Sequence, residues 1–264
     1  MATPLSLGTP TATVIDRLRA AGCVFAEDEA HLLVTSATTP DALADMVDKR
    51  VAGLPLEHVL GWAEFCGLRI AVDPGVFVPR RRTEYLARQA AALLRPHAVV
   101  VDLCCGSGAV AAALAATGDD IELHATDIEP AAVRCARRNI ADHGGAVHEG
   151  DLYSALPDHL RGRIDILVAN APYVPTDAIK LMPPEARDHE PRVALDGGAD
   201  GLDVQRRVSA DARDWLAPGG HLLVETSQRQ APHTARTLAH NGFQTRTTHC
   251  DDLGATVVIG NRPA

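Results

Sequence analysis

The sequence predicts an α/β protein with a doubly wound, mainly parallel sheet, preceded by a small helical domain. Helical and strand-like segments alternate from about Thr83 onward, as in open α/β folds. Glycines and acidic residues follow the predicted strands, and the segment before about Gly61 shows only helical periodicity. We therefore expect a helical domain over residues 1–61, a β-hairpin linker over 62–82 and the α/β domain over 83–264.

The N-terminal segment repeats apolar residues at spacings of three and four, which predicts helices within residues 11–22, 26–37 and 39–53. Thr39 followed by Pro40 is a typical helix start, because Thr caps the first turn and Pro fits its first position. Residues 63–79 then alternate apolar and polar side chains around an Asp-Pro-Gly turn signal at 73–75, which predicts the hairpin.

The α/β domain follows with a regular order of elements. Helices are predicted over residues 83–95, 108–118, 129–144, 201–216 and 229–242. Strands are predicted over residues 98–104, 121–127, 165–170, 219–226, 243–249 and 255–260, with a further strand just before Asp151. Because no helix separates the last two strands, we expect them to form an antiparallel hairpin at one edge of the sheet.

Composition narrows the class of protein. The 264 residues are 46% hydrophobic and 22% charged, which is ordinary for a globular protein. The net charge of -9, from 34 acidic and 25 basic residues, argues against phosphate-driven binding of nucleic acid. No direct nucleic-acid partner is therefore predicted. A monomer is favoured, although the sequence leaves the oligomeric state open.

The sequence lacks targeting signals and metal-binding motifs, so we predict a cytoplasmic protein without a resident metal. The N-terminus lacks the basic start and apolar core of a signal peptide, and no apolar run is long enough for a membrane span. The six Cys show no CxxC pairing, which is typical of a reducing cytoplasm. Among the twelve His, none has a metal-ligand spacing with Cys or acidic residues, so we predict no metal site.

The first predicted strand of the α/β domain leads into "VVVDLCCGSGAVAAALA". Asp102 lies at the carboxyl end of this strand, and Gly106 and Gly108 lie in the turn before the next helix. Ligands of open α/β sheets bind at such strand ends, where glycines let the backbone approach them closely. The stretch also fits a tight turn without a ligand, or a loose dinucleotide-binding pattern.

Two further acidic residues follow the next two strands. Asp127 comes nineteen residues after Gly108, where a carboxylate can accept hydrogen bonds from both hydroxyls of a ribose. It can also cap the helix that begins near Glu129. Asp151 can accept a hydrogen bond from the exocyclic amine of adenine with Leu152 nearby, or simply form a turn.

The stretch "DILVANAPYVP" ends the fourth strand on Asn170, Ala171, Pro172 and Tyr173. Asn170 and the Ala171 carbonyl can each accept one proton of a planar –NH2 group. Pro172 keeps Ala171 extended, and Tyr173 offers an aromatic wall. A turn alone would not need all four residues at this place. The motif therefore predicts a site that holds an amide or amino nitrogen with its face toward an electrophile.

These motifs resemble the class I methyltransferases that use S-adenosylmethionine, and more specifically the HemK/PrmC family of protein-(glutamine-N5) methyltransferases, which modify class 1 peptide-chain release factors. "VVVDLCCGSGAVAAALA", "ATDIEPAAVRCARRN", "GDLYSAL" and "LVANAPYVP" carry the resemblance. "LPLEHVLGWAEFCGLRIAVDPGVFVPRRRTEYL" and "PPEARDHEPRVALDGGADGLDVQRR" extend it. It covers the chain from about Leu54 to the C-terminus, with a generically similar helical segment ahead.

The resemblance implies a Rossmann-like fold, S-adenosylmethionine as cofactor and S-adenosylhomocysteine as product. It assigns the methionine part of the cofactor to the loop after Asp102, the ribose to Asp127, and the adenine to Asp151 with Leu152. The implied cofactor-binding residues are Asp102, Cys104, Cys105, Gly106, Ser107, Gly108, Asp127, Ile128, Asp151, Leu152 and Asn170. The implied catalytic residues, which would bind the glutamine amide, are Asn170, Ala171, Pro172 and Tyr173. The Gly-Gly-Gln glutamine of a class 1 release factor is the implied protein substrate.

Three departures from the family pattern suggest a divergent paralogue. Ala171 replaces the first Pro of Asn-Pro-Pro-Tyr, Cys104 replaces the first Gly of the nucleotide loop, and Arg81 with Arg82 replaces Pro-Glu. Three alternatives remain open: methylation of a glutamine in a ribosomal protein, N6-methylation of adenine in nucleic acid, and a paralogue that binds the cofactor without turnover.

Two further segments have a predicted role on the substrate side. Residues 174–201 lack periodicity and are long for a connection, which favours a lid over an ordinary loop. The helical domain is a substrate-recognition module by family analogy, and its alternative role is to cover an edge of the sheet. The cluster of Arg80, Arg81 and Arg82 is either a solvated rim or a contact for an acidic partner.

Overall fold

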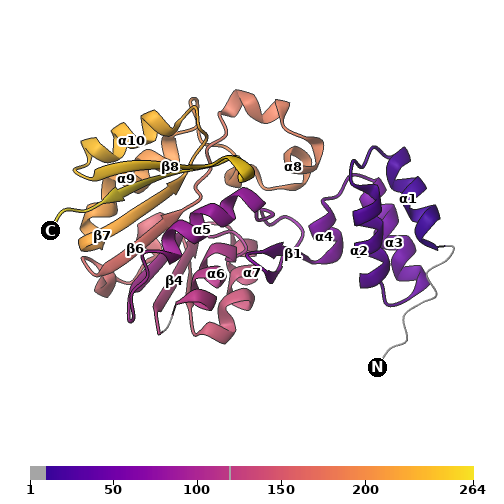
Figure 1. Cartoon of the computed structure of the whole chain (residues 1–264), viewed down its shortest axis with the longest axis horizontal. Helices are drawn as coiled ribbons and strands as arrows, with labels where there is room; N and C mark the ends of the chain where they lie inside the picture. The colour runs from indigo at the N-terminus through magenta and orange to yellow at the C-terminus, as the bar shows by residue number, and fades with distance from the viewer. Residues whose placement is uncertain (1–9, 119) are drawn as a thin grey trace.

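The computed structural model describes residues 10–118 and 120–264 and contains two packed regions (Figure 1). Its α-helices are α1 (Pro10–Ala20), α2 (Ala26–Ser36), α3 (Pro40–Val51), α4 (Leu56–Leu60), α5 (Glu84–Ala91), α6 (Ala109–Thr117), α7 (Pro130–Ile140), α8 (Pro184–His189), α9 (Asp203–Trp215) and α10 (Ala231–His240). Its strands are β1 (Trp62–Phe65), β2 (Leu68–Ala71), β3 (Val99–Leu103), β4 (Glu122–Asp127), β5 (Ala146–Glu149), β6 (Ile164–Ala169), β7 (Leu216–Glu225), β8 (Gln244–Cys250) and β9 (Ala255–Asn261).

The N-terminal helices pack around a core of their own, and Figure 1 shows α1, α2 and α3 beside the sheet rather than on it. Leu18, Leu33 and Val47 are buried at the centre of this bundle. The predicted start of α3 is confirmed, because the Thr39 hydroxyl accepts a hydrogen bond from the Ala42 N–H at 3.1 Å and Pro40 occupies the first turn.

The hairpin exists, but the predicted position of its turn was wrong. β1 and β2 pair in antiparallel register with Phe65 opposite Leu68, so Cys66 and Gly67 form a two-residue turn. Both have positive φ, 51° and 75°, as the favoured hairpin turns require. Asp73 accepts a hydrogen bond from the Val76 N–H in a separate turn further along. The Asp-Pro-Gly signal therefore marks the exit from β2.

The central sheet has seven strands in the order β5-β4-β3-β6-β7-β9-β8. Strands β5, β4, β3, β6 and β7 are parallel, and β9 is antiparallel to both β7 and β8. The predicted antiparallel edge hairpin is thus confirmed, with β9 lying inside β8. The strand order reverses between β3 and β6, which creates the switch point where ligands of such sheets bind.

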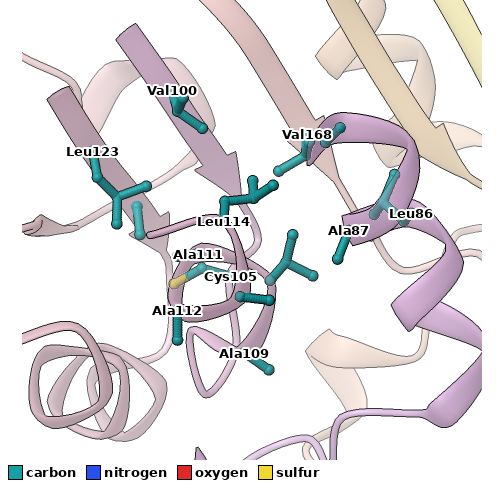
Figure 2. Packing of buried hydrophobic residues seen from close by; sticks show 14 of the residues in the cluster. Leu86, Ala87, Val100, Cys105, Ala109, Ala111, Ala112, Leu114, Leu123 and Val168 are labelled. Atoms are coloured by element: carbon teal, nitrogen blue, oxygen red, sulfur yellow. The ribbon is translucent and has the colours of Figure 1, made fainter. Parts of the chain in front are cut away.

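Helices cover both faces of the sheet. One core joins the sheet to α5, α6 and α7, and Figure 2 shows part of it, with Leu86 from α5, Leu114 from α6, and Val100 and Val168 from the strands. The other core includes Val208 and Trp215 of α9 and Leu238 of α10, among other residues. These three layers leave the carboxyl ends of the strands uncovered, and the loops there build the candidate site.

None of the helices formed by residues 10–118 and 120–264 combines the length and apolarity that a membrane span requires.

Candidate active site

A cavity of about 430 Å³ lies at the carboxyl ends of β3, β4 and β6, at the switch point of the sheet. All but one of the residues that the sequence assigned to the site line it, and they come from four different loops. The predicted residues on the cavity wall are Asp102, Cys104, Cys105, Gly106, Ser107, Asp127, Ile128, Asp151, Leu152, Asn170, Ala171, Pro172 and Tyr173.

Gly108 is the predicted site residue that does not line the cavity. It lies at the N-cap of α6 with φ +76°. A Cβ at this position would come within 3.0 Å of the Ala136 Cβ on α7. The missing side chain therefore lets α6 and α7 approach each other, and this packing sets where the preceding loop meets the cavity.

The two acids at the ends of β3 and β4 have different partners. Asp102 is buried, and its Oδ2 accepts a hydrogen bond from the Ala111 N–H in the first turn of α6, at 3.1 Å. Burial raises the pKa of Asp102 to about 8, although this hydrogen bond opposes the rise. Without a positive charge beside it, Asp102 is thus largely protonated at neutral pH.

Asp127 organises the loops on either side of it. Its Oδ2 accepts from the Gly106 N–H at 2.8 Å, and its Oδ1 accepts from the Glu129 N–H at 2.9 Å. The cofactor role and the helix-start role that the sequence left open are therefore compatible. A carboxylate offers about four acceptor positions, so Asp127 keeps capacity for the hydroxyls of a ribose. Burial raises the pKa of Asp127, and the two N–H donors oppose that rise.

Asp151 faces the cavity beside a positive charge. Its Oδ2 lies 2.6 Å from the Arg207 Nη2, and both side chains line the same wall. Arg207 belongs to α9 and had no assigned role in the sequence pattern. Leu152 follows with φ +49°, and this buried residue lines the cavity.

Asn170 is oriented by a contact that the sequence pattern did not reveal. Its Nδ2 donates to the Thr83 Oγ1 at 3.2 Å, and Thr83 is buried at the start of α5. This contact uses the amide as a donor and leaves Oδ1 to accept from a ligand. No donor to Oδ1, or to the backbone oxygen of Ala171, occurs within residues 10–118 and 120–264. Both oxygens therefore keep their acceptor capacity, and their role in binding a substrate nitrogen stays a prediction.

The backbone after Asn170 is held by the end of the predicted lid. The Val174 N–H donates to the Leu195 oxygen at 3.0 Å, and the Gly197 N–H donates to the Val174 oxygen at 2.9 Å. Gln230 at the start of α10 adds a hydrogen bond from Nε2 to the Tyr173 oxygen, at 3.0 Å. The motif is thus fixed from two sides before any substrate arrives.

A substitution at Gly201 would test whether the backbone position of Tyr173 matters for activity. A Cβ at Gly201 would lie 2.3 Å from the Tyr173 oxygen, and φ there is +76°. We expect Gly201→Ala to displace the backbone at Tyr173, to destabilise the fold by at least about 2 kcal/mol and to lower methyl transfer. Thermal unfolding and initial rates check this result. Gly219→Ala is the matched control, because φ is +81° but nothing lies within 4 Å of the added Cβ. Equal effects of the two changes would contradict the role of the close contact.

A hydrogen-bond network on the cavity wall was not predicted from the sequence. It joins Tyr173 and Arg82 to Glu225. The Tyr173 hydroxyl donates to Glu225 Oε1 at 3.2 Å, and the Arg82 Nε donates to the same oxygen at 3.3 Å. Glu225 is 1% exposed, and its Oε2 has no hydrogen-bond partner among the described residues. Burial raises the pKa of Tyr173, and the Glu225 carboxylate adds to the rise, so the phenol stays protonated and donates. Glu225 therefore fixes two side chains of the cavity wall.

Removing the charge of Glu225 should separate its effect on activity from its effect on stability. Glu225→Gln keeps an acceptor for Tyr173 but removes the ion partner of Arg82. We expect kcat/KM to fall about tenfold with little loss of thermal stability, because a buried carboxylate oxygen without a partner opposes folding. Glu149→Gln, at the exposed end of β5, is the matched control. Unchanged kinetics in Glu225→Gln would show that the network does not position the site.

The Arg cluster of the sequence is divided between internal and external roles. Arg80 Nη2 lies 2.6 Å from the buried Glu190 carboxylate, and Arg82 contacts Glu225 although its own side chain is 44% exposed; Arg81 is exposed as well. Glu190 also accepts from the Val78 N–H, which ties the segment of residues 174–201 to the chain after the hairpin. Two of the three cations thus hold the cavity wall together.

Cys104 and Cys105 are free thiols, as are the other four Cys. Burial raises the pKa of both thiols, and nearby Asp102 and Asp127 raise them further. A protonated thiol is a poor nucleophile, so neither residue is suited to covalent catalysis. Cys104 has φ +56°, a conformation that Gly adopts more easily, so its side chain imposes backbone strain on the loop.

The chain matches a known family model described as "Methyltransferase small domain" over residues 67–182. The fold resembles a methyltransferase of Pyrococcus furiosus, with a TM-score of 0.58 and 16% identity, over 84% of this chain and all of that chain. The strand order and the cavity with its strand-end carboxylates define a class I S-adenosylmethionine-dependent methyltransferase. S-adenosylmethionine is its methyl donor.

Curated relatives narrow the family. A protein of Geobacter sulfurreducens named release factor glutamine methyltransferase is 38% identical over 228 residues, which are 84% of this chain and 79% of the relative. A 4-amino-L-phenylalanine/4-methylamino-L-phenylalanine methyltransferase of Streptomyces pristinaespiralis is 37% identical over 191 residues, which are 70% of this chain and 65% of the relative. The chain belongs to the release factor glutamine methyltransferase family, and the family prediction made from the motifs is confirmed.

Proposed function

We propose that this chain methylates the side-chain amide nitrogen of a protein glutamine, and that its substrate is a class 1 peptide-chain release factor. The observation that carries the proposal is the pair of available acceptors, Asn170 Oδ1 and the Ala171 oxygen, beside the nucleotide loop. A primary amide has two N–H donors in one plane, and the two acceptors match that number. The family membership supports the same acceptor.

The residues of the cavity fit the cofactor. Asp127 has acceptor positions left for a ribose, Asp102 would face a positive amino group, and Ile128 exposes an apolar side chain beside them. When bound, S-adenosylmethionine supplies a methyl group on a positively charged sulfur. Asp151 already contacts Arg207, and it would offer its remaining acceptor positions to the amine of adenine.

The acceptor clamp accounts for reaction at an amide, which is a weak nucleophile because its lone pair is delocalised. Hydrogen bonds to Asn170 and Ala171 would hold the nitrogen with its face toward the methyl group and stabilise the positive charge that develops on it. One N–C bond forms and one S–C bond breaks. The nitrogen would lose one proton to solvent water, which accepts it readily because a methylated amide cation is strongly acidic.

The helical bundle is proposed as the module that contacts the protein substrate. It reaches the cavity through Pro55 and Glu57, which line its wall. Arg50 of α3 is buried and joins Glu29 of α2 at 2.6 Å to Glu185 of α8 at 2.7 Å. The adjacent residues Val24 and Phe25 are 83% and 67% exposed just before α2, and we propose this apolar pair as a contact for the protein partner. A substrate bound to the bundle would therefore reach the lid segment and the cavity together.

The deciding experiment is transfer of radiolabelled methyl from S-adenosylmethionine to purified class 1 release factors, each compared with a version whose Gly-Gly-Gln glutamine is replaced by alanine. Label on the native factor and not on the replacement is the expected result. Label on the factor with its glutamine replaced would overturn the assigned acceptor. No label on any factor, with cofactor binding shown by calorimetry, would overturn the assigned substrate.

A second acceptor class deserves a parallel assay, because the Streptomyces pristinaespiralis relative is named for a free aromatic amine. An aniline nitrogen is also flat and carries two N–H donors. Turnover of 4-amino-L-phenylalanine without turnover of a release factor would place this chain with that relative by activity. The two substrates distinguish the two proposed activities, because only a protein substrate is large enough to contact the helical bundle and the cavity together.

A further inference from the structure

A cluster of imidazoles and one carboxylate lies at the opposite end of β4 from Asp127. Glu122 begins this strand and His124 follows on the same face, while His159 comes from the single turn of 3-10 helix over Asp158–Leu160. Glu122 and Asp127 are five residues apart along the strand, so about 16 Å separates this cluster from the cofactor acid. The cluster is thus independent of the methyltransferase cavity, and none of its members lines that cavity.

The donor atoms of the cluster converge. Glu122 Oε1 lies 3.3 Å from His124 Nε2 and 3.7 Å from His159 Nε2. One ligand atom from each of the three residues lies within 4.8 Å of the others. Bonds of about 2.0–2.1 Å to a tetrahedral zinc ion place neighbouring ligand atoms about 3.4 Å apart. Two of the pairs therefore already match, and His159, which is 59% exposed, can turn to complete the third.

A third imidazole supports His124 from behind. His124 Nδ1 lies 3.0 Å from His148 Nε2, and the two rings are tilted by only 18°. Their centroids are 5.3 Å apart, much further than the two nitrogens, so the rings meet edge to edge through a hydrogen bond. Metal-binding histidines usually donate their second N–H to an acceptor, commonly a carboxylate, a backbone carbonyl or water, and here the acceptor is the His148 Nε2, which fixes the other nitrogen of His124 as the ligand.

The Glu122 carboxylate is also oriented by a neighbouring side chain. Glu122 Oε2 accepts from Arg163 Nη2 at 3.3 Å, which leaves Oε1 facing the two imidazoles. The Arg163 side chain is 52% exposed, so solvent screens the charge that it brings to the carboxylate. With Nδ1–H of His124 donated to His148, Oε1 and the bare Nε2 are two acceptors at 3.3 Å, and a shared cation would satisfy both.

We propose that Glu122, His124 and His159 form a binding site for a divalent transition metal of the Zn²⁺ type, with His148 orienting His124. Water would supply the remaining ligand on the exposed side. Bound metal would join the start of β4 to the segment before β6, so its effect would be on stability rather than on the reaction. The spacing of the residues in sequence concealed this site, because the ligands come from segments 35 residues apart.

Calorimetric titration of the chelator-treated full chain with ZnCl2 tests the proposal. We expect one binding event that Glu122→Gln and His159→Gln each weaken at least tenfold, and that His148→Gln weakens about tenfold. His143→Gln is the matched control, since His143 is exposed and lies outside the cluster. This substitution leaves all six Cys unchanged, so zinc binding by a thiol would persist in it. A rise in melting temperature of about 5 °C is expected at a hundredfold excess of zinc over the dissociation constant.

Two results would overturn the metal site. One is absence of zinc binding by the unchanged chain. In that case His124 Nε2–H simply donates to Glu122, and a proton occupies the position assigned to the metal. The other is zinc binding that persists unchanged in both Glu122→Gln and His159→Gln, which would place the ion on other residues. Circular dichroism of each variant confirms that the fold is retained, so that lost binding reports lost ligands.

Discussion

Asn170→Ala is expected to lower kcat/KM for methyl transfer by at least about a hundredfold while the affinity for S-adenosylmethionine changes little. The substitution removes one of the two acceptors that we propose for the substrate nitrogen, and hydrogen bonds that strengthen in the transition state typically contribute a factor of this size. Initial rates with a fixed release factor measure the loss, and calorimetry measures cofactor binding. Full activity in this variant would refute the assigned role.

Two companion variants sharpen this test. Asn241→Ala is the matched control, because Asn241 is also half-buried and donates to a hydroxyl, that of Ser209, away from the cavity. Thr83→Val keeps Asn170 but removes the oxygen that accepts from its Nδ2. We expect an intermediate loss of activity in Thr83→Val, since the amide can then rotate and present its donor instead of its acceptor.

The affinity for S-adenosylmethionine is expected to rise about tenfold for each pH unit up to about pH 8, and then to level off. Burial raises the pKa of Asp102 to about 8 in the protein without ligand, so below that pH the carboxyl is mostly protonated. A positively charged amino group beside it favours the ionised form, and binding must release the proton. Calorimetry in buffers of different ionisation enthalpy counts that proton, and about one per site is expected at pH 6–7.

Asp102→Asn separates this effect from the titration of the ligand itself. The variant cannot ionise at this position, so the ratio of wild-type to variant affinity isolates Asp102. That ratio should rise with pH, and a flat ratio would contradict the assignment.

The ionisation of Asp102 also affects the free energy of unfolding. Whereas a rise in pH favours cofactor binding, it disfavours the folded state. Because the folded pKa of Asp102 lies above its unfolded value, ionisation of this carboxyl favours the unfolded chain, and the stability that Asp102 contributes to the ligand-free protein is fully present below about pH 4 and is lost as the pH rises to about 8.

The local elements of the fold were predictable because their signals are local. The strands and helices of the α/β domain follow the alternating pattern closely, and the start of α3 follows from Thr39 and Pro40. The hairpin turn was misplaced, since Asp-Pro-Gly is a strong turn signal, whereas Cys66 adopts positive φ without a residue type that favours it. The position of β9 between β7 and β8 depends on strand pairing, which no single segment encodes.

In the candidate site, too, features with a local sequence signal were predictable and contacts between distant segments were not. Strand-end acids and the Asn-Ala-Pro-Tyr motif stand out in the sequence, and the structure places them around one cavity. Their orienting partners do not stand out. Thr83 lies 87 residues from Asn170, and Glu225 lies 52 residues from Tyr173. A buried Glu at the end of a strand has no pattern of its own, so only the assembled sheet reveals its contact with Arg82.

The anchoring of Tyr173 by Glu225 and Gln230 has a consequence for the order in which the protein becomes competent during synthesis. The nucleotide loop, Asp127 and Asp151 are all present once the chain has been made as far as Leu152, but the acceptor motif is fixed by side chains from β7 and the start of α10. The Thr226 N–H in turn donates to the Thr256 oxygen of β9. A nascent chain can therefore assemble its cofactor half first, and it gains a rigid acceptor clamp only when nearly the whole chain has left the ribosome.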